Sequence, residues 1–349
     1  MDDVAYDHSV PRRSDGTRQT LREALPWPED RPFRILSIDG GGICGLLPAL
    51  VLSELERRFL RDAGIGRYFD MIAGTSTGGI IALGLGQGMT GQQIAQVYLE
   101  RGETIFPPRN WIGRKLLFAR RATANGYDPR VLEAELRRLF GDRLFGSSTS
   151  RLCIPAFEGR YGEPFIYKTP HHPDYKKDRF ERLVNVGLAT AAAPTYYTGH
   201  LLGGYTMLDG GIWANNPMMI ALTDALACFR IERRQVRILS LGCGQGTFRT
   251  SERLRTGGWV RWAIAFRDAA MRAQSHNALG QAYLLVGKDQ VRRLDAPESA
   301  APIPMDDVRR ACKELPHVAR ALVESAGHDL CRLFLSEPAE AVQFASPAR

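Results

Sequence analysis

Apolar residues along the chain change from strand-like runs to helical spacing at glycine-rich turns. The segment FRILSID (33–39) is apolar and β-rich, and it stops at a glycine cluster. The next segment, LLPALVLSELERRFL (46–60), repeats apolar residues at helical spacing. The same order recurs over 68–86, where one apolar segment ends at Gly74 and another resumes at Ile80. Two successive strand–turn–helix units indicate a parallel sheet.

The remaining pattern completes an α/β fold. Further strands are predicted at 151–157, 164–169, 205–211 and 236–242, and helices around 130–140, 217–229, 259–286 and 306–335. We therefore predict a three-layer α/β/α sandwich with a mostly parallel central sheet. Residues 1–31 are polar and aperiodic and are expected to form an N-terminal arm. Residues 32–349 are expected to form a single domain with a C-terminal helical extension.

Composition narrows the class of protein. With 44% hydrophobic and 24% charged residues in 349, the chain is neither disordered nor fibrous. Two uncharged stretches, 71–99 and 183–208, are long enough to cross a bilayer, but glycines and polar residues interrupt the first and Pro194 the second. We interpret both as buried parts of a soluble core. Since no apolar signal segment opens the chain, a cytoplasmic protein is expected.

The six cysteines and the net charge exclude fewer functions. No C-x-x-C pair occurs, so neither a metal site nor a disulfide framework is predicted, and reduced, mostly buried thiols are expected. The net charge of +8 favours weak attraction to anionic lipids or nucleotides. It is modest for this length and no recognised nucleic-acid-binding module is present, so nucleic acid is not an expected partner.

The first motif with chemical meaning is Gly74-Thr75-Ser76-Thr77-Gly78. It matches G-x-S-x-G, the nucleophile elbow, in which a sharp strand-to-helix turn exposes a serine hydroxyl. Gly74 and Gly78 are expected where a Cβ would clash with neighbouring backbone. The helix that starts after Ser76 directs free amides, including that of Thr77, toward developing negative charge.

A glycine-rich loop precedes the elbow. Gly40, Gly41 and Gly42 follow the first strand, and their unshielded amides can converge on a phosphate or an oxyanion. The spacing also matches the G-x-G-x-x-G dinucleotide fingerprint, which expects an acidic residue about 20 residues further on. Here the next strand leads to Ser76 instead, so we predict that the loop forms an oxyanion hole for the serine.

Asp209-Gly210-Gly211 is the third motif, at the end of the strand predicted over 205–211. Its aspartate can lie near Ser76 if that strand runs parallel to the elbow strand. Taken alone, the motif is also typical of a turn in which an aspartate binds nearby backbone amides.

The three motifs together resemble the patatin-like phospholipase family over about residues 33–335. The segments SIDGGGICGLL, GTSTGGIIALGL, LATAAAPTYY and LDGGIWANNP occur in the order of that family. The resemblance implies that Ser76 is the nucleophile of a Ser-Asp dyad with Asp209, that the loop amides bind the oxyanion, and that no cofactor is needed. It also implies a substrate, the fatty-acyl esters of membrane glycerophospholipids. One departure is Cys44, where family members usually carry Arg or Lys.

Within the family, the chain is most similar to bacterial effectors of cyclic-oligonucleotide-based anti-phage signalling. The similar segments include IFPPR (105–109), LLFARR (116–121) and YKTPHHP (167–173). This similarity implies activation by a cyclic dinucleotide, peripheral contact with the inner membrane, degradation of the cell's own membrane, and possible homo-oligomers.

Two basic, aromatic-bearing stretches are candidates for the nucleotide or lipid contacts, 109–121 and 249–272. Arginine binds phosphate bidentately, and tryptophan stacks on bases or lies at lipid interfaces. The candidate side chains of the first stretch are Arg109, Arg114, Lys115, Arg120 and Arg121. Solvated basic helix faces would have the same composition.

Two other functions remain open from the sequence. An α/β-hydrolase-type esterase would use a Ser-Asp-His triad in that chain order, and His276, His317 and His328 follow Asp209. The chain lacks the H-G-G-G-type loop of that class, and Asp39-Gly40-Gly41-Gly42 already occupies its place. A catalytically silent nucleotide-binding or membrane-binding module is the second alternative.

Overall fold

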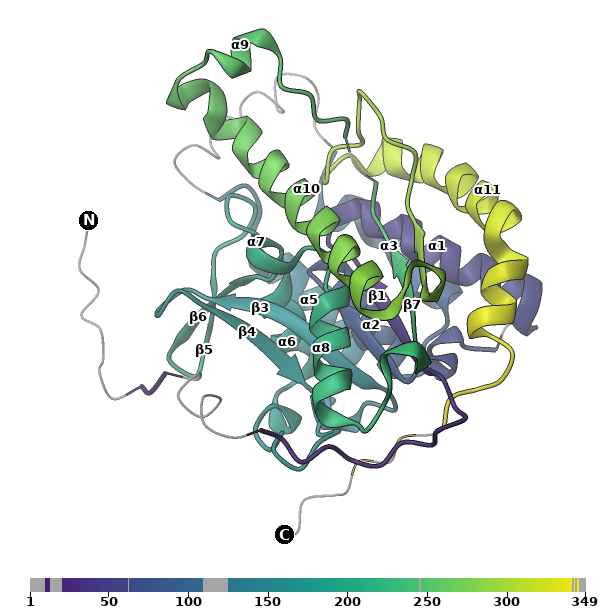
Figure 1. Ribbon diagram of the computed structural model, residues 1–349. Helices are drawn as coiled ribbons and strands as arrows, with labels where there is room; N and C mark the ends of the chain where they lie inside the picture. Colours follow the sequence, from purple (N-terminus) through teal and green to yellow (C-terminus); the bar gives the residue numbers. More distant parts are fainter. Residues whose placement is uncertain are drawn as a thin grey trace.

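The computed structural model describes residues 10–12, 21–61, 63–108, 125–244, 246–340, 342 and 344. One mixed, mostly parallel sheet runs through the described chain with helices on both faces (Figure 1). Its strands are β1 (Phe33–Ile38), β2 (Met71–Gly74), β3 (Arg151–Glu158), β4 (Glu163–Lys168), β5 (His200–Leu202), β6 (Tyr205–Asp209), β7 (Val236–Leu241) and β8 (Val291–Leu294). The order is β5-β6-β3-β2-β1-β7-β8, with β4 paired to β3. The predicted three-layer α/β/α class is therefore confirmed.

The centre of the sheet is parallel and fully buried. β1 pairs in parallel with both β2 and β7, and all six of its residues are buried. Ile35 and Leu36 point into the apolar clusters on opposite faces. A strand covered on both faces must be apolar throughout, which is why FRILSI shows no alternation.

One helical layer carries the elbow. It contains α1 (Leu46–Leu55), α2 (Thr77–Gly86), α3 (Gly91–Ile105), α5 (Pro129–Phe140), α6 (Leu183–Ala191) and α11 (Val308–Phe334), whose buried side chains form one cluster with that face of the sheet. α1 continues into a π-helical turn, Glu56–Leu60. α11 packs along α1, so the expected C-terminal extension is part of the core.

The opposite face is covered by α8 (Met218–Cys228) and α10 (Trp259–Val286). The short helices α7 (Gly211–Ala214) and α9 (Glu252–Arg255) precede them, and α9 with the start of α10 projects beyond the sheet (Figure 1). The last part of the expected N-terminal arm belongs to this layer as well. Trp27 is buried against Phe33 and Phe229, and the Leu25 amide donates to the Cys228 carbonyl at 2.8 Å.

The sequence pattern missed the short strands β5 and β8 and the helices α3, α6, α7 and α9. β5 and β8 are only three and four residues long, α3 begins in the uncharged stretch 71–99, and α6 lies inside 183–208. Both stretches contain buried helices and strands of this core, as expected. Among the described residues, no helix is both long and apolar enough to cross a bilayer. The described cysteines are free thiols, four of them buried.

Candidate active site

The elbow lies between β2 and α2. Ser76 has φ 55° and ψ −121°, a left-handed backbone that a residue with a side chain rarely adopts. The turn is tight because both flanking glycines touch backbone. A Cβ on Gly74 would lie 2.0 Å from the Gly78 carbonyl oxygen, and one on Gly78 would lie 2.3 Å from that of Ile38. The predicted reason for both glycines is confirmed.

Asp209 reaches the elbow from an antiparallel strand, so the parallel strand considered for it from the sequence was wrong. β2 pairs with the first residues of β3, up to Ala73 opposite Cys153, and then separates from β3. β6 pairs with the later residues of β3 in the antiparallel sense, with Asp209 opposite Ala156. Asp209 therefore ends its strand level with Ser76, three residues beyond the end of the β2 pairing.

The two side chains are in direct contact. The Ser76 hydroxyl donates to Asp209 Oδ2 at 2.6 Å, and Oδ1 of the same carboxylate accepts the Gly211 amide at 2.6 Å. Both residues are buried. Burial raises the pKa of Asp209 from 3.8 to about 6, while the Ser76 and Gly211 hydrogen bonds oppose that rise. A carboxylate with such a pKa accepts a proton more readily than an ordinary one near neutral pH.

The structure changes the predicted set of oxyanion-hole amides. The Gly40 amide is already used, because it donates to the Asn215 carbonyl at 3.1 Å. No hydrogen bond from the Gly41, Gly42 or Thr77 amide occurs within the described part of the chain. Gly42 and Thr77 line the same cavity as Ser76. We therefore remove Gly40 from the set and keep Gly41, Gly42 and Thr77 as candidates.

A buried arginine, which no motif indicated, anchors the glycine loop. Arg293 of β8 donates to both oxygens of Asp39, at 2.9 and 2.7 Å, and to Asp295 at 2.6 Å. Asp39 directly precedes the loop, so this ion pair fixes the point where the loop leaves β1. Cys44 supplies no charge there, since burial raises the pKa of its thiol to about 12.

An apolar cavity opens beside Ser76 and encloses about 90 Å³. Its wall comes from α2, α3, α5 and the segment after α6, and includes Ile80, Ile94, Val97, Ile105, Phe106, Leu132, Leu136, Leu139, Tyr196 and Tyr197. Tyr98 also lines it and hydrogen-bonds the Thr77 hydroxyl, which pins the start of α2. Such a wall binds hydrocarbon by excluding water.

The three histidines of the alternative triad lie away from this contact. His276 is exposed on α10, and His317 and His328 are exposed on α11. The Ser76 proton already points at Asp209, so no imidazole stands between them. The geometry favours the dyad over the triad.

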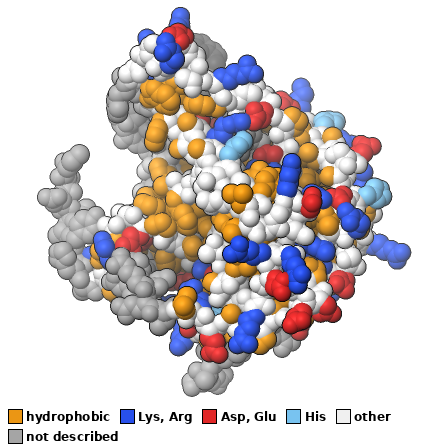
Figure 2. All heavy atoms as spheres, viewed as in Figure 1, with side chains coloured by type: hydrophobic (Ala, Val, Ile, Leu, Met, Phe, Trp, Pro, Cys, Tyr) orange, Lys and Arg blue, Asp and Glu red, His pale blue; other side chains and the backbone are white. Residues whose placement is uncertain are grey.

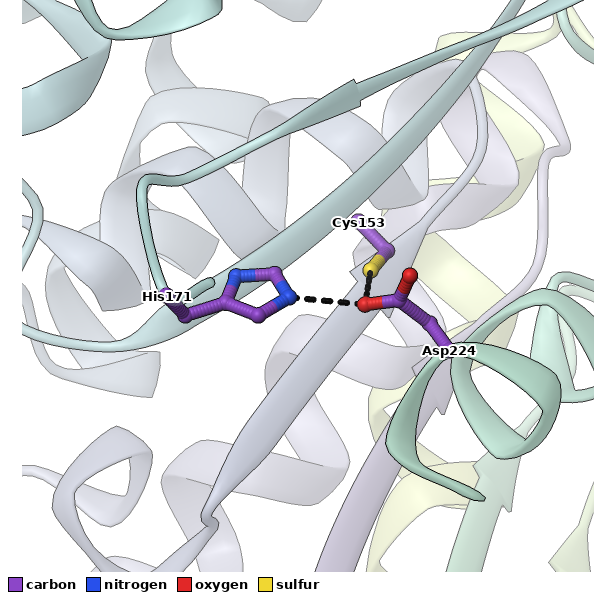
Figure 3. A group of neighbouring side chains, drawn as sticks. All are labelled: Cys153, His171 and Asp224. Carbon is purple, nitrogen blue, oxygen red and sulfur yellow. Dashed lines mark hydrogen bonds and ion pairs between the residues drawn. The ribbon is translucent and has the colours of Figure 1, made fainter. Parts of the chain in front are cut away.

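A second buried ionisable cluster lies on the other face of the sheet. Cys153 Sγ, His171 Nε2 and Asp224 Oδ2 all lie within 4.8 Å of one another (Figure 3). Their spacing would suit a metal ion, but Asp224 already binds cations and donors. His171 donates to Oδ2 at 2.7 Å, and Lys168 and the Tyr175 hydroxyl each donate to Oδ1 at 2.5 Å.

This cluster has the chemistry of an ion-pair network. Burial raises the pKa of the Cys153 thiol well above its ordinary value, so the thiol adds no charge to the cluster. Lys168 already supplies the positive charge that Asp224 requires. We therefore assign the cluster to structure: it ties the segment after β4 to α8.

The predicted nucleotide or lipid contacts are only partly placed. Arg109, Arg114, Lys115, Arg120 and Arg121 lie outside the described residues. In the second basic stretch, Arg253 and Arg261 are exposed, whereas Arg255 and Arg267 pair with neighbouring acids, Glu252 and Asp268.

Comparison with known proteins identifies the family of this chain. Residues 36–222, more than half of the chain, match the family model of patatin-like phospholipases. The chain belongs to this family. The matched region contains the glycine loop, Ser76 and Asp209.

Bacterial relatives share much of this sequence. A protein named cGAMP-activated phospholipase from Escherichia coli is 38% identical over 227 residues, which are 61% of this chain and 63% of that protein. One of the same name from Vibrio cholerae is 38% identical over 203 residues, 55% and 57% of the two chains. A third, from Pseudomonas aeruginosa, is 31% identical over 267 residues, 73% and 78%. The match thus spans less than two thirds of the first two relatives.

Proposed function

We propose that this protein is a serine acyl hydrolase that cleaves fatty-acyl esters of membrane glycerophospholipids through a Ser76–Asp209 dyad. One observation carries the proposal: the Ser76 hydroxyl donates to a buried aspartate at 2.6 Å, at the mouth of an apolar cavity. Membership of the patatin-like phospholipase family supports the same reaction.

The reaction follows from these contacts. Asp209 accepts the Ser76 proton as the serine oxygen attacks the ester carbonyl, and the carbonyl oxygen becomes an oxyanion. The Gly41, Gly42 and Thr77 amides stabilise that charge, and one donor of this kind is worth about 2.7–4 kcal/mol. Asp209 then returns the proton to the departing lysophospholipid alkoxide. Water, deprotonated by Asp209, then attacks the acyl-enzyme, and the fatty acid leaves as Asp209 returns that proton to the Ser76 oxygen.

The surface near the site suits a lipid substrate. Figure 2 shows apolar side chains gathered on the face that carries α7 and α10, where Ile212 of α7 and Phe266 of α10 are exposed. α7 directly follows Asp209. The exposed apolar side chains of α7 and α10, together with the exposed cations Arg253 of α9 and Arg261 of α10, favour peripheral contact with an anionic bilayer. The acyl chain would enter the cavity while the head group stays at this surface.

The names of the three relatives support a regulatory proposal. Each is called a cGAMP-activated phospholipase, so we extend activation by a cyclic dinucleotide to this chain. Activation of a membrane lipase would degrade the membrane of the producing cell from its inner face, as in anti-phage defence.

The test measures fatty acid released from phosphatidylglycerol–phosphatidylethanolamine vesicles, with and without cGAMP. Wild type should release fatty acid when cGAMP is present, and Ser76→Ala should lose at least about 10³-fold of that rate. A His276→Ala/His317→Ala/His328→Ala variant is the control and should stay within about twofold of wild type. If the histidine variant is inactive but folded, the triad replaces the dyad. If Ser76→Ala retains the rate, the proposed nucleophile is wrong.

A further inference from the structure

A second hollow lies on the far side of the sheet from the catalytic cavity. It has a volume of about 550 Å³, which is within the range of small-molecule sites, roughly 300–1,000 Å³. Leu25 of the N-terminal segment forms one wall, and the segment 170–180 that follows β4 forms the rest. Nothing in the catalytic mechanism uses it.

The hollow combines aromatic rings with cations. Tyr175 and the exposed Phe180 supply ring faces, and Lys176 and Arg179 supply positive charge. Lys168 Nζ and the Arg22 guanidinium lie 4.7 and 4.9 Å from the centre of the Tyr175 ring, so cations already contact that ring. The exposed Phe180 ring is the candidate for a base. Flat rings stack on bases, and lysine and arginine bind phosphate.

The carboxylates near the hollow have partners of their own. Asp178 accepts the Lys168 amide at 3.0 Å, and Asp174 lies 3.4 Å from His172. Asp224 is neutralised by Lys168 within its own cluster. Within the described residues, Lys176 has no carboxylate at ion-pair distance. The described residues that line the hollow thus include two cations, Lys176 and Arg179, and no carboxylate.

Two residues of this wall also hold α8. The Tyr175 hydroxyl and the His171 ring donate to opposite oxygens of Asp224, which lies in the middle of α8. A ligand that moves the segment 170–180 would act on α8 through these two bonds.

α8 in turn leads directly to the catalytic machinery. The residues just before it, Ala214 and Asn215, contact the elbow residue Thr75 and the glycine loop. The Ala214 carbonyl accepts the Thr75 hydroxyl at 2.6 Å, and the Asn215 carbonyl accepts the Gly40 amide at 3.1 Å. A shift of α8 along its axis would therefore move the elbow and the glycine loop together.

We propose that the hollow between Leu25 and residues 170–180 binds the activating cyclic dinucleotide and transmits binding to Ser76 through Asp224 and α8. The proposal rests on the activation proposed above. The phosphates would be held by Lys176 and Arg179, and a base would stack on Phe180.

The binding test compares two charge-matched variants by calorimetric titration with cGAMP. Lys176→Glu/Arg179→Glu reverses two cations of the hollow. Lys177→Glu/Lys313→Glu reverses two exposed cations that do not line it. The first variant should weaken binding at least tenfold, and the second should stay within about twofold of wild type. Equal affinity for the two variants, or no cGAMP binding by wild type, overturns the site.

The same titration separates this inference from the proposed enzyme function. Ser76→Ala should bind cGAMP like wild type, since Ser76 does not line the hollow. If wild type binds cGAMP through Lys176 and Arg179 yet releases no fatty acid from vesicles, the hydrolase proposal fails and the binding site stands.

A separate variant tests whether cGAMP binding is transmitted to Ser76 through Asp224. Tyr175→Phe keeps the ring but removes the hydroxyl bond to Asp224. It should bind cGAMP within about threefold of wild type, while cGAMP-stimulated fatty-acid release falls at least fivefold. Unfolding midpoints confirm that the variant is folded. Full stimulation in this variant overturns transmission through Asp224.

Discussion

Two buried aspartates on opposite faces of the sheet differ in their protonation behaviour. Burial raises the pKa of both carboxyl groups, but their partners differ. Asp209 accepts only neutral donors, Ser76 and Gly211, and its pKa stays high, at about 6. Around Asp224, the hydrogen bond and charge of His171 and the charge of Lys168 bring the pKa well below its ordinary value.

The difference lies in the presence of a cation. Asp224, which has Lys168 as a cation partner, is held in its charged form and serves structure. A buried carboxylate without one is held near the point where it can gain or lose a proton, which a base requires. The catalytic aspartate is thus stabilised less well than the structural one, and its charge has an energetic cost at neutral pH.

Neutralising Asp224 should have the largest effect on the free energy of unfolding. Asp224→Asn leaves Lys168 with a neutral partner in a mostly buried position. Loss of one partner of a buried ion pair costs about 3–5 kcal/mol of unfolding free energy. Urea unfolding at pH 7.5 measures it, and Lys177→Glu, a change of an exposed cation on the same segment, is the control. A loss below about 1 kcal/mol would show that the cluster contributes little to stability.

Neutralising the catalytic aspartate, Asp209, should change the free energy of unfolding in the opposite direction. Asp209→Asn removes a charge that burial disfavours, so the variant should be more stable than wild type at pH 8. The rise of the Asp209 pKa from 3.8 to about 6 corresponds to about 3 kcal/mol.

The sign of that effect depends on pH. A carboxyl whose pKa is raised in the folded state stabilises the fold below its unfolded pKa, and loses that contribution as the pH rises through about 6. The advantage of Asp209→Asn should therefore shrink from pH 8 to pH 4. Unfolding free energies at both pH values measure it, and an advantage independent of pH would contradict the raised pKa.

Much of this arrangement could be predicted from the sequence. The apolar runs that end at glycine-rich turns indicated six strands and the sheet class, because parallel strands buried on both faces are apolar throughout. Gly74 and Gly78 around Ser76 indicated the elbow, since only backbone crowding requires glycine on both sides. Asp209 was indicated by its place at a strand end beside two glycines.

Other features depended on contacts that no short pattern records. β6 pairs antiparallel with the part of β3 that lies beyond its pairing with β2. Which residues of β3 pair with which strand is set by the sheet register, and no short sequence pattern shows it. The use of the Gly40 amide by Asn215 joins residues 175 positions apart. Arg293 lies in VRRL, a segment too short to indicate a strand, although its side chain anchors the glycine loop.

The pH dependence of catalysis should follow Asp209 alone. The base acts only when deprotonated, so kcat/KM for a soluble acyl ester should fall about tenfold per pH unit below about 6 and level off above 7. Asp224 stays ionised over this range, so Lys168→Gln, which changes only the surroundings of Asp224, should leave the midpoint in place. Initial rates from pH 5 to pH 8, with circular dichroism to verify folding, measure both enzymes. A midpoint near 4 would mean that Asp209 is an ordinary carboxyl, and one that moves in Lys168→Gln would mean that the two faces of the sheet are electrostatically coupled.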